Sequence, residues 1–300
     1  MHLGNGAVTP ACAAIGFAAA GAGLAIGWWL ARRAGRVDPL KWGAATALVF
    51  LLQTLNLPVL PQTSGHFVGG FLLAMWFGSG WGLLAMALVL GAQSLLFGDG
   101  GWLALGLNVV NMGVLPCLVV HPLWARLCGG ARRGPARWAG MAGAAWASVL
   151  LASAACGLEL LGRADARAQA GPLLGTLLGV HALIALIEVG VTLAAVYVAS
   201  AVVRTGRARV AGWAAAGAGA VALVLGRSPW PDGLERALEV QQLGDWASRA
   251  AALAGRAQEA VAPWTGYTPG ATLAACAGVA VLAGVVARAL AAPRKARVLA

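Results

Sequence analysis

Charged residues are scarce in this sequence. Asp, Glu, Lys and Arg make up 10% of its 300 residues, against roughly 25% in soluble domains. Hydrophobic residues make up 60%, and several stretches of about 18 residues or more hold almost no charge, which suits helices that cross a bilayer. These runs are continuous rather than alternating, so helices are expected rather than barrel strands. The composition excludes an ordinary soluble domain and predicts an all-α, polytopic transmembrane helical bundle.

Recognisable catalytic motifs are also missing. The sequence contains no H-E-x-x-H, no G-x-S-x-G and no P-loop, so neither hydrolase nor ATPase chemistry is visible. The five cysteines have no C-x-x-C spacing, and most lie within apolar runs, where cysteine acts as a small packing residue. Any energy that the function of this chain needs must therefore come from elsewhere.

Acidic residues are few as well, with 10 against 21 basic ones and a formal net charge of +11. A basic chain can bind nucleic acid, but here Lys and Arg lie in short clusters between apolar runs, a pattern that sets membrane topology. We therefore expect the basic residues to interact with the lipid bilayer and not with nucleic acid.

The apolar runs predict about nine membrane spans. They lie near residues 7–31, 41–57, 66–78, 80–97, 102–124, 137–161, 172–203, 209–226 and 268–291. With this division, 15 of the 21 Lys and Arg residues fall on one side of the membrane, which the positive-inside rule makes cytoplasmic. The N-terminus is then outside and the C-terminus cytoplasmic, in a multi-pass protein of the cell (inner) membrane.

The distribution of apolar and polar residues changes after Arg209. Residues 1–205 are predicted to form one membrane domain, and residues 206–300 a second module of two spans joined by an extracytoplasmic loop. In that loop, Asp232 is expected to cap a helix that starts near Leu234. We refer to residues 206–300 as the C-terminal module.

His2 directly follows the initiator methionine. Methionine is usually trimmed only before small residues, so the amine of Met1 should be present and free. This amine, the His2 backbone nitrogen and the His2 imidazole can form adjacent five- and six-membered chelate rings around one metal. With His66 as a fourth ligand, such planar nitrogen ligation suits Ni(II) or Cu(II), and imidazole also serves Co(II). The ordinary alternative is a solvated terminal histidine.

Other polar residues in or beside the spans are candidates because buried polar groups are costly in lipid. His66 lies at a helix start beside small residues, while His181 and Glu188 are seven residues apart and share a helix face. Asn108 and Asn111 could orient histidine ligands. The alternatives are a histidine at the lipid–water boundary, a hydrogen-bonded pair and asparagines that bridge helices. The candidates for holding the histidines in place are Ser64, Asn108, Asn111, His181 and Glu188.

Four segments of the sequence resemble the signatures of one and the same protein family. They are MHLGNGAVTP at residues 1–10, QTLNLPV and TSGH within 53–66, QSLLFGDGG with Asn108 and NMG within 93–113, and HALI through Glu188. Together, in this order over roughly residues 1–200, they resemble the CbiM/NikM family, the substrate-specific (S) membrane components of energy-coupling-factor transporters for cobalt and nickel. The PDGLE run at 231–235 is similar to the signature of the PDGLE/CbiN-like auxiliary subunit.

The resemblance implies that Met1, His2 and His66 bind Ni(II) or Co(II) as a transported substrate, in a chain that is no enzyme and holds no catalytic cofactor. It implies capture at the outer face, inward delivery driven by CbiO/NikO-like ATPase subunits, and coupling through a CbiQ/NikQ-like transmembrane T component. The small residues 43–47 are a candidate face for docking the T component. The loop from 226 to 267 is expected to help load or gate the site.

The sequence departs from the family's opening M-H-I-P-D-G at Gly4 and Asn5. Loss of the proline and of the negative charge predicts a looser N-terminal loop, whose ordering on binding would weaken affinity. The preference for nickel or cobalt stays open for this reason.

Two other classes of protein compete with the transporter. An intramembrane metal-dependent enzyme built on His121, His181 and Glu188 would bring these three side chains into one pocket. The transporter instead brings Met1, His2 and His66 together. A membrane assembly or sensor protein would bind neither metal and would need no ATPase partner.

Overall fold

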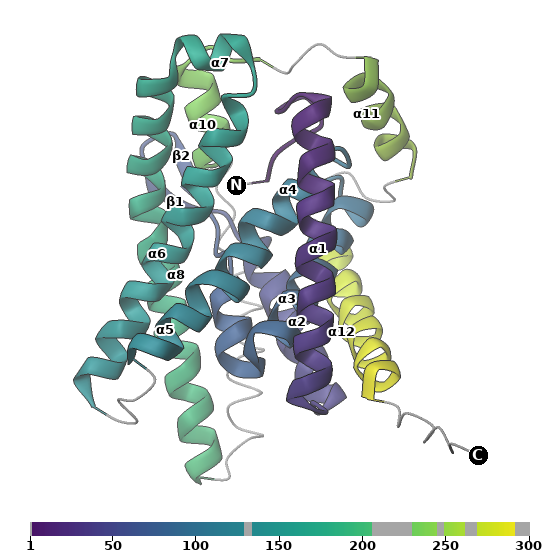
Figure 1. Cartoon of the computed structure of the whole chain (residues 1–300), viewed down its shortest axis with the longest axis vertical. Coiled ribbons are helices and arrows are strands. Elements are labelled where there is room, and N and C mark those ends of the chain that lie inside the picture. The colour runs from purple at the N-terminus through teal and green to yellow at the C-terminus, as the bar shows by residue number, and fades with distance from the viewer. Residues whose placement is uncertain (1, 129–133, 206–229, 245–248, 262–268, 292–300) are drawn as a thin grey trace.

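The computed structural model describes residues 2–128, 134–205, 230–244, 249–261 and 269–291, which are almost entirely helical (Figure 1). The elements in chain order are α1 Pro10–Ala34, α2 Pro39–Gln53, β1 Leu57–Leu60, β2 Thr63–Gly65, α3 Gly70–Leu96, α4 Leu105–Val109, the π-helix η1 Val110–Val120, α5 His121–Cys128, α6 Pro135–Leu160, α7 Ala164–Ala168, α8 Ala170–Thr205, α10 Gly233–Val240, α11 Arg249–Val261 and α12 Pro269–Ala291.

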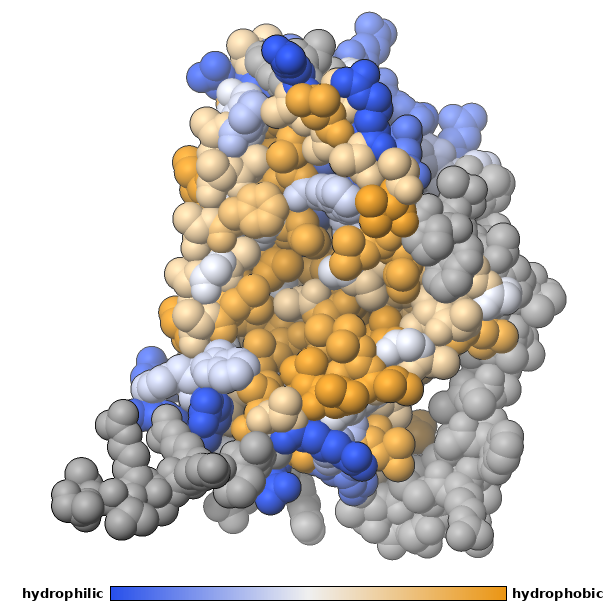
Figure 2. Space-filling model, turned by 90° about the vertical axis from the view of Figure 1, so that its right-hand side faces the viewer, coloured by the Kyte–Doolittle hydropathy of each residue, from blue (hydrophilic) through white to orange (hydrophobic). Residues whose placement is uncertain are grey.

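The chain is a multi-pass membrane protein. Six helices in the described part are long and apolar enough to cross a bilayer, and a broad hydrophobic band lies between hydrophilic ends of the molecule (Figure 2). The predicted helical bundle is therefore confirmed. The number of nine spans stays a prediction, because residues 209–226 lie outside the described part and α2 has only 15 residues.

The predicted spans at 66–78 and 80–97 need correction, because residues 66–69 precede the helix and the rest of both spans, up to Leu96, lies in the single element α3. The chain breaks within this helix at Gly78, whose φ of 80° favours glycine. A Cβ built on Gly82 would lie 2.6 Å from the Ala74 nitrogen, whereas eight residues of straight helix span about 12 Å. The arm that begins at Gly70 thus folds back on the rest of α3 and is too short to cross a bilayer alone.

Helix α12 of the C-terminal module packs along α2. The contact is close at Gly43, where a Cβ would lie 2.5 Å from the Ala280 carbonyl oxygen. Small residues allow such close approach of helices in membranes. Part of the small-residue face at 43–47, which the sequence offered for docking the T component, is therefore covered by the chain's own helix.

Local signals explain where the helices near the site begin. The Thr9 hydroxyl accepts a hydrogen bond from Cys12 N, and Pro10 fills the first turn of α1. Asp232 caps α10, as the sequence predicts: its carboxylate accepts hydrogen bonds from Leu234 N and Glu235 N, while the Glu235 side chain accepts one from Asp232 N. This reciprocal capping box fixes Asp232 at the end of α10 that faces β2.

Candidate metal centre

A short hairpin positions His66. Strands β1 and β2 pair antiparallel, and His66 follows β2 directly. The Glu188 carboxylate, from the middle of α8, accepts hydrogen bonds from Val68 N at 2.8 Å and Gly69 N at 3.0 Å. The Gln53 amide donates to the Val68 carbonyl. The segment between β2 and α3 is thus tied to two helices, which gives His66 a defined place.

We expect Glu188→Ala to destabilise this segment. The change leaves two buried backbone N–H groups without their acceptor, which costs roughly 1–3 kcal/mol for each group. The midpoint of thermal unfolding in detergent should fall clearly for Glu188→Ala but not for Glu259→Ala, because Glu259 is exposed on α11. Equal midpoints for the two variants would contradict this role for Glu188.

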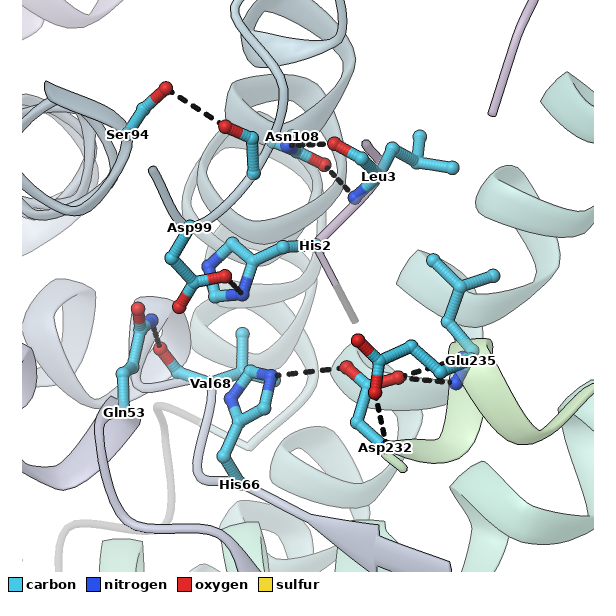
Figure 3. A network of polar contacts seen from close by, with 12 residues as sticks. His2, Leu3, Gln53, His66, Val68, Ser94, Asp99, Asn108, Asp232 and Glu235 are labelled. Atoms are coloured by element: carbon cyan, nitrogen blue, oxygen red, sulfur yellow. Dashed lines mark hydrogen bonds and ion pairs between the residues drawn. The ribbon is translucent and has the colours of Figure 1, made fainter. Parts of the chain in front are cut away.

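Asn108 positions the N-terminal arm, which we define as residues 2–8. Its side-chain oxygen accepts a hydrogen bond from Leu3 N at 2.9 Å, and its amide nitrogen donates to Leu3 O at 3.2 Å. Gly101 N also donates to Leu3 O. These bonds hold the residue next to His2 from both sides of its backbone (Figure 3).

As a result, the imidazole rings of His2 and His66 stack against each other. Their ring centroids are 5.1 Å apart and their planes differ by 15°, and both side chains are nearly buried, with 7% and 5% of their surface exposed. The structure thus brings together two of the three residues that the sequence proposed as ligands. The third, Met1, lies outside the described residues.

Two carboxylates flank the imidazoles (Figure 3). Asp99 Oδ1 lies 3.3 Å from His2 Nδ1, and Asp232 Oδ2 lies 3.9 Å from His66 Nε2. Sequence reasoning missed both as site residues. Asp99 was visible only inside the F-G-D-G-G run, and Asp232 only as a helix cap, so no spacing signal placed either beside a histidine.

The protonation states favour metal ligation. Burial lowers the pKa of His2, against the opposing effect of Asp99. Burial, with a smaller effect of His2, lowers the pKa of His66 to about 3. Burial also acts on Asp232, but other effects, among them the hydrogen bond from Glu235 N, outweigh it and hold the pKa of its carboxyl below the usual value. Both imidazoles are therefore neutral near pH 7, the form that binds metals, beside an ionised carboxylate.

The C-terminal module closes the site from one side. Ser64 N and Ser64 Oγ donate to the carbonyl oxygens of Pro231 and Trp230, at 2.8 Å each. His66, His181 and Asp232 line one cavity of about 10 Å³, roughly the size of a single water. Ser64 and His181, two of the predicted supporting residues, thus lie next to His66.

Asn111 and His121 lie apart from the two imidazoles. Asn111 donates to Glu159 at 2.8 Å, and His121 contacts Ser79 at 2.9 Å and stacks with Trp124. Within the described residues, no three His, Cys, Asp or Glu side chains form a metal-holding group. The contacts of His121 therefore give no support to an enzyme pocket shared with His181 and Glu188.

Comparison with known proteins decides the family. Residues 2–207 match the family described as the cobalt uptake substrate-specific transmembrane region, CbiM. The chain belongs to the CbiM family. The match starts at His2 and covers the described residues of the candidate site except Asp232, which belongs to the C-terminal module.

Relatives of this CbiM-family chain include proteins named as fused nickel transport proteins. It is 36% identical over 135 residues to a protein of Archaeoglobus fulgidus named as a fused nickel transport protein NikMN, covering 45% of this chain and 44% of that one. It is 31% identical over 172 residues to the fused nickel transport protein NikMN of Rhodobacter capsulatus, covering 54% and 48%. The chain thus spans about half the length of these relatives.

Solved structures agree with the fold. A crystal structure of a transition metal transporter superposes with a TM-score of 0.58 at 25% identity, covering 67% of this chain and 93% of the other. A truncated transition metal transporter superposes with a TM-score of 0.56 at 26% identity, covering 66% and 97%. The CbiM-like part of the chain therefore has the fold of these transporters.

Proposed function

We propose that this chain is the substrate-binding membrane component of an importer for Ni(II) or Co(II). The observation that supports it most is the pair of buried, stacked imidazoles of His2 and His66. His2 lies beside the first residue of the chain, so the amine and the His2 amide nitrogen can join the two imidazoles in one planar set of four nitrogens. Nitrogen ligands in a plane suit Ni(II), and imidazole serves Co(II) as well.

In the proposed site, the carboxylates of Asp99 and Asp232 stabilise the charge of the bound metal ion. In the chelate, the metal takes the place of the contact between His2 Nδ1 and Asp99. Asp99 and Asp232 then stand as negative charges beside a divalent cation in a buried setting, where charges interact strongly. Their charge offsets part of the cost of burying the ion.

Orientation and energy coupling complete the proposal. By the positive-inside rule, the basic clusters favour a position of the site at the outer side of the cell membrane, and we infer capture of the metal outside and delivery inward. The chain contains no nucleotide-binding motif, and ATP is hydrolysed by separate CbiO/NikO-like subunits coupled through a CbiQ/NikQ-like T component. The NikMN relatives, named as nickel transport proteins, support this assignment.

An N-terminal extension tests the proposed ligand set. Adding Gly-Ser before Met1 keeps both imidazoles but moves the amine out of the chelate. We expect the Ni(II) affinity of the purified chain to fall by at least about 100-fold, the upper end of the loss caused by removing a mere supporting residue. Titration of Ni(II) against a competing chelator measures it, with the same dipeptide added at the C-terminus as the control. Unchanged affinity in the N-terminally extended chain would reject the amine as a ligand.

A further inference from the structure

Gln258 is a buried amide on α11 that uses both of its ends. It is 4% exposed. Its nitrogen donates to the carbonyl oxygens of Gly100 at 2.8 Å and Ser94 at 3.1 Å. Its oxygen accepts hydrogen bonds from the Asn5 side chain at 2.8 Å and from Trp102 N at 3.3 Å. Buried polar groups are normally hydrogen-bonded, and here both ends of the amide have partners on other segments.

These partners lie on the two segments that carry the site. Asn5 belongs to the N-terminal arm, three residues after His2, and Gly100 follows Asp99, which contacts the His2 ring. The Asn5 oxygen in turn accepts a hydrogen bond from Leu103 N at 3.0 Å. One side chain of the C-terminal module therefore joins the arm of His2 to the loop of Asp99.

The direction of the Asn5–Gln258 pair is fixed by its surroundings. Turning the Gln258 amide around would place its oxygen against the carbonyl oxygens of Ser94 and Gly100, and turning the Asn5 amide around would lose the bond from Leu103 N. The Gln258 oxygen must therefore face a donor at position 5. A buried acceptor that faces another acceptor loses its hydrogen bond and is repelled as well.

We propose that Gln258 is a positioning residue for the metal site, which holds His2 and Asp99 in place through its amide pair with Asn5. The proposal rests on the proposed function, because it concerns the same ligand set. It assigns to α11 a part in metal binding that reaches the ligands from the side opposite α10. It also gives the position-5 asparagine of this chain a reason: its donor matches the Gln258 oxygen.

The proposal predicts a result opposite in sign to simple electrostatics. Asn5→Asp has the same shape and adds a negative charge near the cation, which alone would tighten binding. Here the new carboxylate oxygen would face the Gln258 oxygen and loosen the arm. We expect Asn5→Asp to weaken Ni(II) binding about tenfold, the size of one lost buried hydrogen bond. Gln258→Ala removes both the bonds and the conflict and should weaken binding to a similar degree.

The double variant distinguishes positioning from independent effects. If the two residues act as a pair, Asn5→Asp should cost nothing more once Gln258 is alanine, so the double variant binds no more weakly than Gln258→Ala. The experiment titrates the purified full chain and the three variants with nickel chloride against a competing chelator, and compares the visible absorption bands of bound Ni(II). A merely structural bond would lower the unfolding temperature of the metal-free chain without changing affinity or absorption.

Four outcomes would overturn the proposal. Tighter binding by Asn5→Asp, or losses that multiply in the double variant, would each show that the pair does not position the site. Equal binding by all four chains would do the same while leaving the proposed function intact. A parent chain that binds no nickel would overturn the proposed function and this inference together. If Gln258→Ala fails to fold, the sign of the Asn5→Asp effect decides alone.

Discussion

Replacing His2 by alanine is expected to abolish metal uptake. The variant loses an imidazole that is buried against His66, with ring centroids 5.1 Å apart. Without this imidazole the six-membered chelate ring cannot form, and only the five-membered ring is left. We expect uptake of nickel and cobalt to fall by at least about 100-fold, because loss of a ligand costs more than the roughly 10–100-fold caused by loss of a supporting residue. Uptake of radioactive nickel or cobalt in cells that also make the coupling subunits measures it.

His121→Ala is the matched control for this experiment. His121 is also a partly buried histidine of the bundle, but it contacts Ser79 and Trp124 instead of the candidate ligands. The control should retain most of the parent's uptake at equal amounts of protein in the membrane. Full uptake by His2→Ala would reject the proposed site. Loss of uptake in His121→Ala alone would instead favour chemistry built on that residue.

Removing residues 206–300 is expected to reduce uptake severely while the remaining chain still enters the membrane. The truncation removes Asp232 from the side of His66, the carbonyl partners of Ser64, and Gln258 from the side of Asn5. It also uncovers the face of α2 that α12 packs on. That face is apolar, so lipid can cover it, and insertion should survive. Uptake and the amount of membrane-extracted protein are measured together.

Asp232→Asn is the point variant that belongs beside the truncation. Asparagine caps helices as well as aspartate, so α10 should keep its start while the negative charge near His66 is lost. We expect uptake between those of the parent and the truncated chain. Normal uptake by the truncated chain would show that the C-terminal module is dispensable and that the contacts of Asp232 and Gln258 are not needed for loading.

From the sequence, ligand chemistry offered His66 as a fourth ligand beside His2, and the family likeness then implied that the two bind one metal. The positions of His2 and His66 in the chain do not show how close the two side chains lie in the fold. Their contact depends on Asn108 and Glu188, which bind the two backbone segments from separate helices. Both were predicted as supporting residues, and the structure places both in contact with the segments that carry the histidines. Asp99 and Asp232 could not be predicted as neighbours, because only the tertiary fold brings them there.

Two expectations failed because the three-dimensional fold, which the local sequence does not show, decides the outcome. A looser N-terminal arm was predicted from Gly4 and Asn5, yet the Asn5 amide has hydrogen bonds at both ends, to Leu103 and Gln258. The compensating residue lies in the other part of the chain, so a comparison of the arm alone could not show it. The hydropathy of residues 66–97 likewise located a break near Gly78, but it could not show that the first helical arm starts only at Gly70 and is too short to cross a bilayer alone.

In the proposed importer, the near-complete burial of both imidazoles is expected to limit how fast a metal ion binds and leaves. An ion in water cannot touch His66 while the Ser64–Pro231 and Ser64–Trp230 bonds hold α10 against the hairpin. Its dwell time on the protein is then governed by how often these segments separate, rather than by how fast one ligand replaces another on the metal. Weakening those two carbonyl contacts would shorten the dwell time while leaving the nitrogen donors untouched.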